Sequence, residues 1–383
     1  MTTESRSTPG LQWVNIIFFA VTTLGGVVGA PLYIYYNGIA AAEIWLALAF
    51  FVLSGLGITV GYHRLFAHAT FKTNRVVRFL MLFFGAAAFE QSALEWSSQH
   101  RDHHKYVDTD KDPYSIKKGF FYAHIGWLIF WKRENDFSNV KNLSNDPMIM
   151  HQHRYYVLWA TVAGILTPAA IGWMTGHLLG ALLIAVCLRL TLVYHATFFI
   201  NSVCHTFGKA TYDVDATAKD NWLVAFLTFG EGYHNFHHRF GGDYRNGVRW
   251  YQFDPSKWTI ALLEKLGLAW DLKRVSDFRI MAARLDGEKT RLDSWLEETA
   301  DASHRLRANF GEQAARRYER LRKRLVDWEA AAKEHSKVLQ GQVSNYSDDI
   351  RESTRRRVAE AKARFQEARA DWNSLLRECA VAA

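Results

Sequence analysis

Histidines that could bind metal ions are concentrated in three short segments of the sequence, GYHRLFAH, QHRDHHK and GEGYHNFHH. Their eight histidines are His63, His68, His100, His103, His104, His234, His237 and His238. In the second and third segments, steps of three and four residues place three imidazoles on one face of a helix. The step of five in the first segment shares a face less well and fits the end of a helix. Imidazole binds iron, zinc, copper and nickel, and eight imidazoles exceed what one ion accepts, so the pattern predicts two metal ions.

Four long apolar runs lie around these segments, at about residues 11–36, 44–62, 155–174 and 178–200. Each is long enough, as a helix, to cross the hydrocarbon core of a bilayer. The mean hydropathy of -0.14 does not reveal them, because the C-terminal part of the chain is densely charged. The sequence therefore predicts an all-α integral membrane protein with four transmembrane helices.

The distribution of Lys and Arg predicts how these helices are oriented. Both are frequent between the second and third runs, whereas the short connections near residues 37–42 and 172–177 contain neither. By the positive-inside rule, the long segment and both termini are cytoplasmic. Within that segment, Val76–Ala93 is apolar but contains Arg78 and Glu90, which favours a helix on the membrane surface over a further crossing. All three histidine segments then lie on the cytoplasmic side, where they can form one histidine-rich cap that holds both metal ions.

From about Ala283 onward the sequence becomes rich in Arg, Glu and Ala. Apolar residues recur there at steps of three and four, as in helices that pack along one seam: Val358, Ala361, Phe365, Ala368, Trp372 and Leu375. We therefore divide the chain into a membrane domain, residues 1–282, and a charged helical extension, residues 283–383, that could support self-association. The nearly balanced charge of the extension argues against nucleic-acid binding, and three cysteines form neither a disulfide framework nor a thiolate metal site.

The histidine segments and the residues around them resemble the membrane-bound fatty acid desaturases, most closely the acyl-CoA delta-9 (stearoyl-CoA) branch. The resemblance extends from about residue 11 to residue 280 and includes GITVGYHRLFAHATFK, HHKYVDTDKDPYS, NSVCHTFG and GEGYHNFHHRFGGDYR. It implies a di-iron enzyme that uses O2 and two electrons to introduce a cis double bond, in the delta-9 position, into a long acyl chain. It also implies a ninth metal ligand, His205, and a residue, Asn201, that reaches a metal ion through water.

Residues around the metal ligands are assigned as hypotheses. Acidic residues can orient a metal-bound imidazole by accepting its free N–H, and the candidates are Glu95, Asp102, Asp108, Asp112 and Glu231. On the second span, Ala47, Phe51 and Ser54 share a face that leads to His63, and we expect this face to limit the length of the acyl chain in a bent tunnel. By resemblance, Trp96 and Thr197 line the same tunnel.

The headgroup of the substrate and the source of electrons are less defined. Animal acyl-CoA desaturases have Arg-Asp, which contacts CoA, where this chain has Ser98 and Gln99. The remaining basic candidates are Arg101, Lys117 and Lys118, and the headgroup could be CoA, a phospholipid or a carrier protein. The sequence has no haem-binding HPGG segment and no iron–sulfur cysteine pattern, so we expect a separate electron donor of the cytochrome b5, ferredoxin or reductase type.

Two alternatives remain at this stage. A di-iron lipid hydroxylase or ketolase would use the same ligands, because hydroxylation and desaturation begin with the same hydrogen abstraction. A non-catalytic zinc-binding membrane protein would also need histidines. A transporter, however, places its ligands near the middle of the bilayer, whereas these segments follow the ends of the spans.

Overall fold

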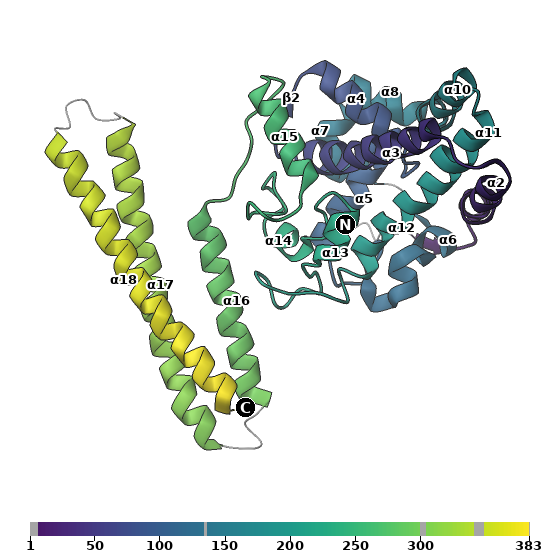
Figure 1. Ribbon diagram of the computed structural model, residues 1–383. Helices are drawn as coiled ribbons and strands as arrows, with labels where there is room; N and C mark the ends of the chain where they lie inside the picture. Colours follow the sequence, from purple (N-terminus) through teal and green to yellow (C-terminus); the bar gives the residue numbers. More distant parts are fainter. Residues whose placement is uncertain (1–6, 134–135, 299–303, 341–347, 383) are drawn as a thin grey trace. The chain divides into compact units, whose positions relative to one another are not determined.

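A computed structural model shows a chain that is almost entirely helical (Figure 1). The structure describes residues 7–133, 136–298, 304–340 and 348–382. The chain divides into two compact units: unit 1 consists of Met1–Ala210 and Asp215–Arg274, and unit 2 of Thr211–Val214 and Val275–Ala383. Within the described ranges, four helices are long and apolar enough to cross a membrane. The predicted all-α class with four spans is therefore confirmed.

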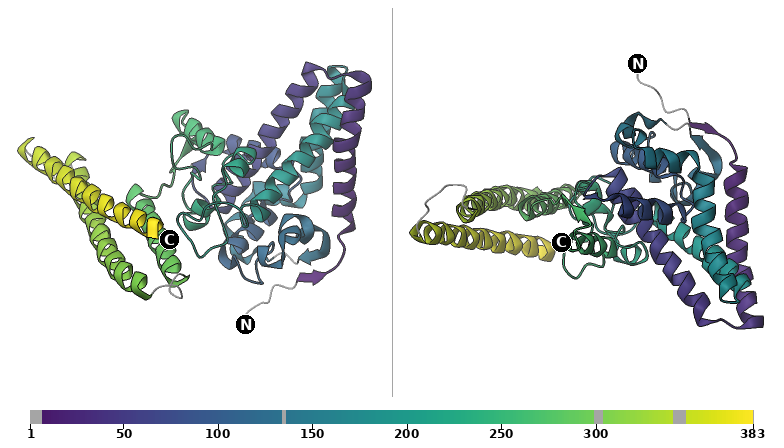
Figure 2. Two further views of the ribbon diagram at one scale, coloured as in Figure 1. Left: turned by 60° about the horizontal axis from the view of Figure 1, so that its bottom comes forward. Right: turned by 90° about the horizontal axis from the view of Figure 1, so that it is seen from above.

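Each span in unit 1 contains a π-helical segment. The label η marks both the π-helices and the short 3-10 helices. Span 1 is formed by α1 (Trp13–Leu24), η1 (Gly25–Gly29) and α2 (Ala30–Asn37), and span 2 by α3 (Ala41–Leu56) and η2 (Gly57–Ala67). Span 3 is formed by α9 (Tyr156–Thr161), η6 (Val162–Leu166) and α10 (Thr167–Met174), and span 4 by α11 (Leu178–Gly180), η7 (Ala181–Leu188) and α12 (Arg189–Ser202). Span 4 packs against the other three (Figure 2).

Small residues let the helices approach closely, as is common between transmembrane helices. A Cβ atom on Gly26 of span 1 would lie 2.7 Å from the Cα atom of Leu188 in span 4. A Cβ atom on Gly57 of span 2 would lie 2.3 Å from the backbone nitrogen of Gly85. Any larger residue at these two positions would separate the backbones that they bring together.

Arg189 is a fully buried cation within span 4. Its guanidinium donates hydrogen bonds to the carbonyls of Ala87 (3.0 Å) and Gly164 (3.1 Å), and to the Ser54 hydroxyl (3.4 Å). It therefore faces the interior of the helix bundle and connects spans 2, 3 and 4 through polar groups that the bilayer would otherwise leave without partners.

The remaining elements of unit 1 are short. The helices are α4 (Arg75–Ala86), α5 (Ala93–Tyr106), η3 (Ile116–Lys118), η4 (Tyr122–Gly126), α6 (Trp127–Phe130), η5 (Phe137–Val140), α7 (Lys141–Ser144), α8 (Pro147–Arg154), α13 (Trp222–Leu227), α14 (His234–Arg239) and α15 (Pro255–Lys265). The strands form two antiparallel pairs, β1 (Ser7–Pro9) with β3 (Trp131–Arg133) and β2 (Lys72–Thr73) with β4 (Ala269–Trp270). The helix expected at Val76–Ala93 is shorter in the structure: α4 ends at Ala86, a turn with positive φ at Phe89 and Gln91 follows, and α5 begins at Ala93. Helix α4 buries Val77 and Leu82 and exposes Val76 and Phe79.

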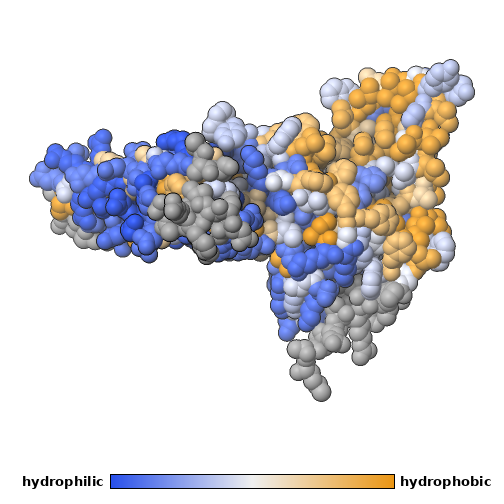
Figure 3. Space-filling model, turned by 90° about the horizontal axis from the view of Figure 1, so that it is seen from below, coloured by the Kyte–Doolittle hydropathy of each residue, from blue (hydrophilic) through white to orange (hydrophobic). Residues whose placement is uncertain are grey.

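Unit 2 contains three long helices, α16 (Asp277–Glu298), α17 (His304–Leu339) and α18 (Asp348–Ala382). Their shared core includes most of the predicted seam, since Phe365, Ala368, Trp372 and Leu375 belong to the same buried cluster as Leu321. Glu288 of α16 accepts hydrogen bonds from Arg369 and from the Trp372 indole of α18. The predicted C-terminal helices are thus confirmed. The visible surface of unit 2 is mainly hydrophilic, whereas wide hydrophobic areas cover unit 1 (Figure 3).

Candidate metal centre

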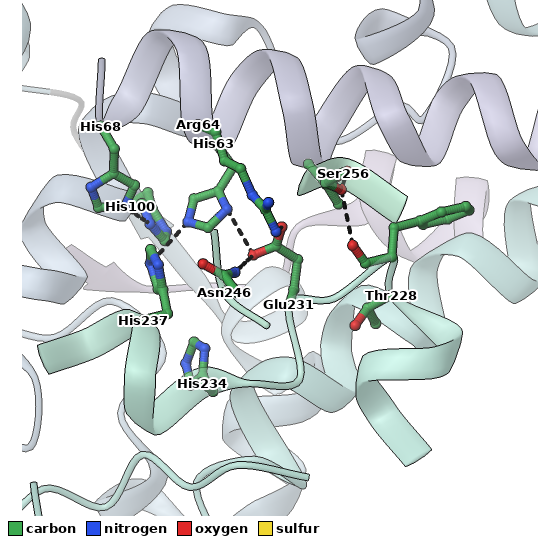
Figure 4. Close-up of polar contacts among 12 residues, drawn as sticks. His63, Arg64, His68, His100, Thr228, Glu231, His234, His237, Asn246 and Ser256 are labelled. Carbon is green, nitrogen blue, oxygen red and sulfur yellow. Dashed lines mark hydrogen bonds and ion pairs between the residues drawn. The ribbon is translucent and has the colours of Figure 1, made fainter. Parts of the chain in front are cut away.

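Five of the nine predicted ligands meet as one group, consisting of His63, His68, His100, His104 and His237. One ring nitrogen from each lies within 4.8 Å of all the others. The Nε2 atom of His237 lies 2.9 Å from Nε2 of His63, and the Nε2 atoms of His68 and His100 are 2.8 Å apart (Figure 4). Nε2 of His237 also lies 2.8 Å from Nε2 of His104. Three separate parts of the chain thus supply one cluster of nitrogens.

The other four predicted ligands form a second group, consisting of His103, His205, His234 and His238. Their Nε2 atoms are separated by 3.2 Å between His103 and His238, 3.1 Å between His205 and His234, and 3.0 Å between His234 and His238. His205, which the sequence pattern alone did not single out, lies in the turn that follows α12.

Hydrogen bonds between the rings cannot account for these short distances. Nε2 of His237 approaches two other Nε2 atoms at once, whereas a neutral imidazole carries only one N–H. Two nitrogens bound about 2.1 Å from one ion lie about 3.0 Å apart at right angles and about 3.4 Å apart in a tetrahedron. The short separations of 2.8–3.2 Å are in the range expected for nitrogens that face one shared ion, so each group suits a metal ion.

The protonation state of the imidazoles also suits metal binding. Burial, followed by the neighbouring imidazoles, lowers the pKa well below its usual value for one set of rings: His68, His100, His104, His205, His234, His237 and His238. These rings are therefore neutral at pH 7. A neutral imidazole is the form that binds a metal ion.

The step of five between His63 and His68 has a backbone explanation. His63 lies in η2 and His68 directly follows its last residue, and the backbone N–H of His68 donates to the carbonyl of His63 over 3.0 Å. This i→i+5 bond defines a π-helix, in which residues five apart lie on one face. A helix end was expected here, but the widened helix was not. It brings both rings to the same metal group, with ring centroids 4.9 Å apart.

Glu231 orients the first group. Its carboxylate lies 2.8 Å from Nδ1 of His63 and accepts hydrogen bonds from Arg64 (3.0 Å) and from Asn246 (2.6 Å) (Figure 4). Burial alone would raise the pKa of Glu231, but its interactions with His63 and Arg64 bring the pKa below its usual value. The carboxylate is therefore ionised and fixes the proton of His63 on Nδ1, which leaves Nε2 for a metal ion. Arg64 also pairs with Asp254 at 3.0 Å.

Two further acidic residues orient the second group. Asp112 lies 2.9 Å from Nδ1 of His103. Asp108 accepts a hydrogen bond from the hydroxyl of Thr217 over 2.6 Å, and this hydroxyl lies 2.7 Å from Nδ1 of His205. Thr217 is a residue that the sequence did not indicate, because its role depends on a contact with Asp108, 109 residues away.

The last two acidic candidates, Glu95 and Asp102, help to position helix α5. Glu95 is the third residue of α5 and receives a hydrogen bond from the Ser92 hydroxyl that caps this helix. Asp102 accepts a hydrogen bond of 2.8 Å from the side chain of Asn139. Both interactions help to place α5, which carries three of the ligands.

An apolar cavity adjoins both groups of histidines. Its wall includes His63, His100, His103 and His234, together with five of the other predicted residues, Phe51, Trp96, Thr197, Asn201 and Glu231. Ala47 and Ser54 are not among its described lining residues, and Ser54 instead bonds to the carbonyl of Phe50.

Glu90 is an acidic residue in this apolar wall that the sequence analysis did not assign to the site. It accepts hydrogen bonds from Thr197 (2.8 Å) and from the Trp96 indole (3.3 Å). Burial raises the pKa of Glu90 to about 7. Its position within an otherwise apolar stretch was a signal that could have indicated a buried role.

The basic candidates for the headgroup differ in their surroundings. Arg101 donates hydrogen bonds to the carbonyls of Phe66, Ala67 and Asn139, so its guanidinium holds η2 and η5. Lys117 and Lys118 are exposed on η3.

The fold and the site define a membrane protein with two adjoining histidine clusters that suit metal ions. The sequence profile of the fatty acid desaturase family matches residues 37–271, and the chain belongs to this family.

Three relatives support this assignment. The chain is 39% identical over 288 residues to the protein named "probable acyl-CoA desaturase" of Schizosaccharomyces pombe, covering 74% of this chain and 59% of the relative. It is 35% identical over 276 residues to the sn-1 stearoyl-lipid 9-desaturase of Anabaena variabilis, covering 71% and 98%. It is 33% identical over 280 residues to the stearoyl-CoA desaturase of Sus scrofa, covering 70% and 76%. The chain thus spans somewhat more than half of the Schizosaccharomyces pombe protein.

Proposed function

We propose that this chain is a membrane di-iron desaturase that introduces a cis double bond, in the delta-9 position, into a long-chain acyl-CoA or acyl-lipid. The observation that carries the proposal is the placement of nine imidazoles in groups of five and four, with members of both groups, His63, His100, His103 and His234, lining an apolar cavity. The relatives act on both CoA-linked and lipid-linked chains according to their names, so both substrate classes remain in the proposal.

Iron, when bound, supplies the redox chemistry in which O2 and two electrons remove two hydrogens from neighbouring methylene groups, with two protons consumed and two waters formed. The nine histidines would hold two irons, and Asn201 would reach the four-histidine group through water. Residues of this chain would orient the metal-binding rings and the substrate. Glu231 and Asp112 keep the protons of His63 and His103 on Nδ1, so that Nε2 can face the metal.

The cavity would bind the acyl chain and exclude water. Trp96 and Thr197 share Glu90 as a hydrogen-bond acceptor, so their side chains are held in one arrangement beside the histidines. A rigid wall of this kind is needed to present one pair of carbons to the metal ions, because small displacements reduce rates strongly. Phe51, which lines the cavity, is proposed to limit the length of the chain, with Ala47 and Ser54 on the same helix.

The membrane arrangement follows from the charge distribution. We place the histidine-bearing side and both termini in the cytoplasm, since the segment between spans 2 and 3 is rich in Lys and Arg, whereas the short connections near residues 37–42 and 172–177 contain neither. Lys117 and Lys118 would contact the substrate headgroup. A separate donor of the cytochrome b5, ferredoxin or reductase type would supply electrons, and unit 2 would support self-association.

The test is expression in a host that lacks its own desaturase, followed by mass spectrometry of cellular lipids. Products two mass units lighter than the saturated chain, with about two irons per chain in the purified protein, support the proposal. A gain of oxygen would indicate a hydroxylase or ketolase instead. Zinc in place of iron, or continued desaturation after replacement of both His103 and His237 by Ala, would overturn it.

A further inference from the structure

Unit 1 carries an exposed apolar surface outside its four spans, on α13 and α15. We call it the aromatic face, and its residues are Trp222, Leu223, Phe226, Leu227, Trp258 and Leu262. Their exposed fractions run from 38% for Leu227 to 75% for Trp222. Phe253 joins the two helices, with its ring 4.9 Å from that of Phe226 and 5.4 Å from that of Trp258. The surface is therefore continuous.

The sequence of both helices is arranged to expose these residues. The α13 segment WLVAFL contains no charge and buries only Val224 and Ala225. On α15, Trp258, Leu262 and Leu266 recur at steps of four on the exposed side, while Ser256 and Ile260 are buried. Contiguous apolar surface of this kind on a folded protein marks a contact with another molecule or with a membrane.

Contacts with span 2 fix the depth of this face. The ring of Phe229, which follows α13, packs against Gly55 and lies 5.7 Å from the ring of Phe51. Ser256 at the start of α15 donates to the carbonyl of Phe229 (2.9 Å), and its hydroxyl lies 2.7 Å from that of Thr59. Span 2 covers Ala41–Ala67, and about 20 of its residues suffice to cross the hydrocarbon core. Phe51, Gly55 and Thr59 all lie among roughly the first 20 residues counted from Ala41 and therefore at the depth of the hydrocarbon core.

Residues 227–229, at the end of α13, separate the cavity from the outside. Leu227, Thr228 and Phe229 line the cavity from one side. Leu227 is also 38% exposed on the aromatic face, so one residue contributes to both surfaces. The backbone here adopts an uncommon left-handed conformation, with φ of 55° at Phe229 and 105° at Gly230.

We propose that the aromatic face is seated in the bilayer, at the level of the lipid headgroups and upper acyl chains. Tryptophan and other amphipathic aromatic residues prefer this layer. A protein partner such as an electron donor would be attracted by charge, and α13 offers none. The lipid-facing surface of unit 1 then extends beyond the spans to α13 and α15, and lipid chains lie against the wall of the cavity at Leu227.

Spin labelling in vesicles tests this placement. In a chain whose three cysteines are replaced by Ala, single cysteines are introduced by Trp222→Cys and Trp258→Cys and labelled with a nitroxide. Two matched controls are Val28→Cys on span 1, which is 50% exposed, and Glu264→Cys, an exposed position on α15 itself. The protein is reconstituted in vesicles of phosphatidylcholine and phosphatidylglycerol, and collisions with O2 are compared with collisions with a water-soluble nickel complex.

We expect the labels at 222 and 258 to behave like the label at 28, with O2 access exceeding nickel access several-fold, and the label at 264 to favour nickel. Labels at 222 and 258 that follow the label at 264 would overturn the proposal. Dipolar broadening between labels at 222 would also overturn it, since it would identify the face as a contact between copies. The measurement needs neither iron nor turnover, so its failure is distinguishable from failure of the proposed function.

Discussion

Unit 1 and unit 2 place their polar groups in opposite ways. Unit 1 buries a network in which Arg64, Glu231 and Asp254 support the histidines. Unit 2 buries leucines, alanines and aromatic residues, and most of its described ion pairs lie on exposed side chains, as in the pair of Arg316 and Glu312. Buried polar groups require partners in fixed positions, whereas an apolar core does not. The difference indicates that the buried polar groups of unit 1 position side chains for chemistry, whereas unit 2 is stabilised by apolar packing.

The largest effect should come from the histidines of unit 1. We expect His237→Ala and His234→Ala each to remove one of two irons and to reduce product formation to background, because each group loses a central ligand. Iron analysis and lipid mass spectrometry check this. His335→Ala, in unit 2, should leave both values unchanged, since His335 contacts Thr354 and not the metal centre. Equal loss in all three variants would remove the contrast between the units.

A core substitution in unit 2 should affect stability alone. Trp372 is fully buried, so Trp372→Ala should reduce the stability of this unit by about 3–5 kcal/mol. Hydrogen exchange in the full chain should then become faster in peptides from α16, α17 and α18, with iron content unchanged. Loss of iron in this variant would show that the metal centre depends on unit 2.

Glu90, in the cavity wall of unit 1, predicts that the stability of the protein depends on pH. The pKa of Glu90 is raised from 4.5 to about 7, so the folded state binds more protons than the unfolded state between these values. Stability therefore falls as pH rises from about 4.5 to about 7, by about 3 kcal/mol from this residue. We expect Glu90→Gln, compared with the parent protein by thermal unfolding, to lack this component. A pH dependence identical to that of the parent protein would contradict the assignment.

The orienting carboxylates should have intermediate effects. Glu231→Gln and Asp112→Asn should each weaken iron binding at the adjacent group by about 10–100-fold. Competition with a chelator measures the affinity. Glu288→Gln in unit 2 is the control, since it disturbs a partly buried carboxylate that contacts Arg369 and Trp372. If this control lowers iron affinity equally, the orienting role is wrong.

The smallest effect should come from the surface of unit 2. The exposed pair of Arg316 and Glu312 lies four residues apart on α17, where such pairs contribute about 0.3–0.5 kcal/mol. Arg316→Ala should therefore change stability by no more than this amount. A larger loss in thermal unfolding would indicate that surface charges of unit 2 have a role beyond solvation.

Patterns along the sequence predicted much of the fold. The four spans followed from uninterrupted apolar runs, and the seam of unit 2 followed from apolar residues at steps of three and four. The histidines could be found because each cluster is local. Their division into five and four could not, because His100 and His103 share a helix but belong to different groups.

Contacts between distant segments explain what the sequence did not reveal. Thr217 connects Asp108 with His205, and Asn246 supports Glu231, but neither residue lies in a recognisable motif. Arg101 was considered for the headgroup from its charge, whereas its guanidinium bonds to three backbone carbonyls. Charge and spacing identify a type of residue, but partners are determined by the packing of the chain.

The π-helical end of span 2 has a consequence for how the first histidine segment tolerates change. Deleting one residue from Arg64–Ala67 would give His63 and His68 the four-residue spacing of an ordinary α-helix, in which their side chains would still share one face. It would also remove the bond between the His68 N–H and the His63 carbonyl and rotate everything after it by about 100°. The length of this short stretch is therefore part of the metal site, as much as the histidines at its ends.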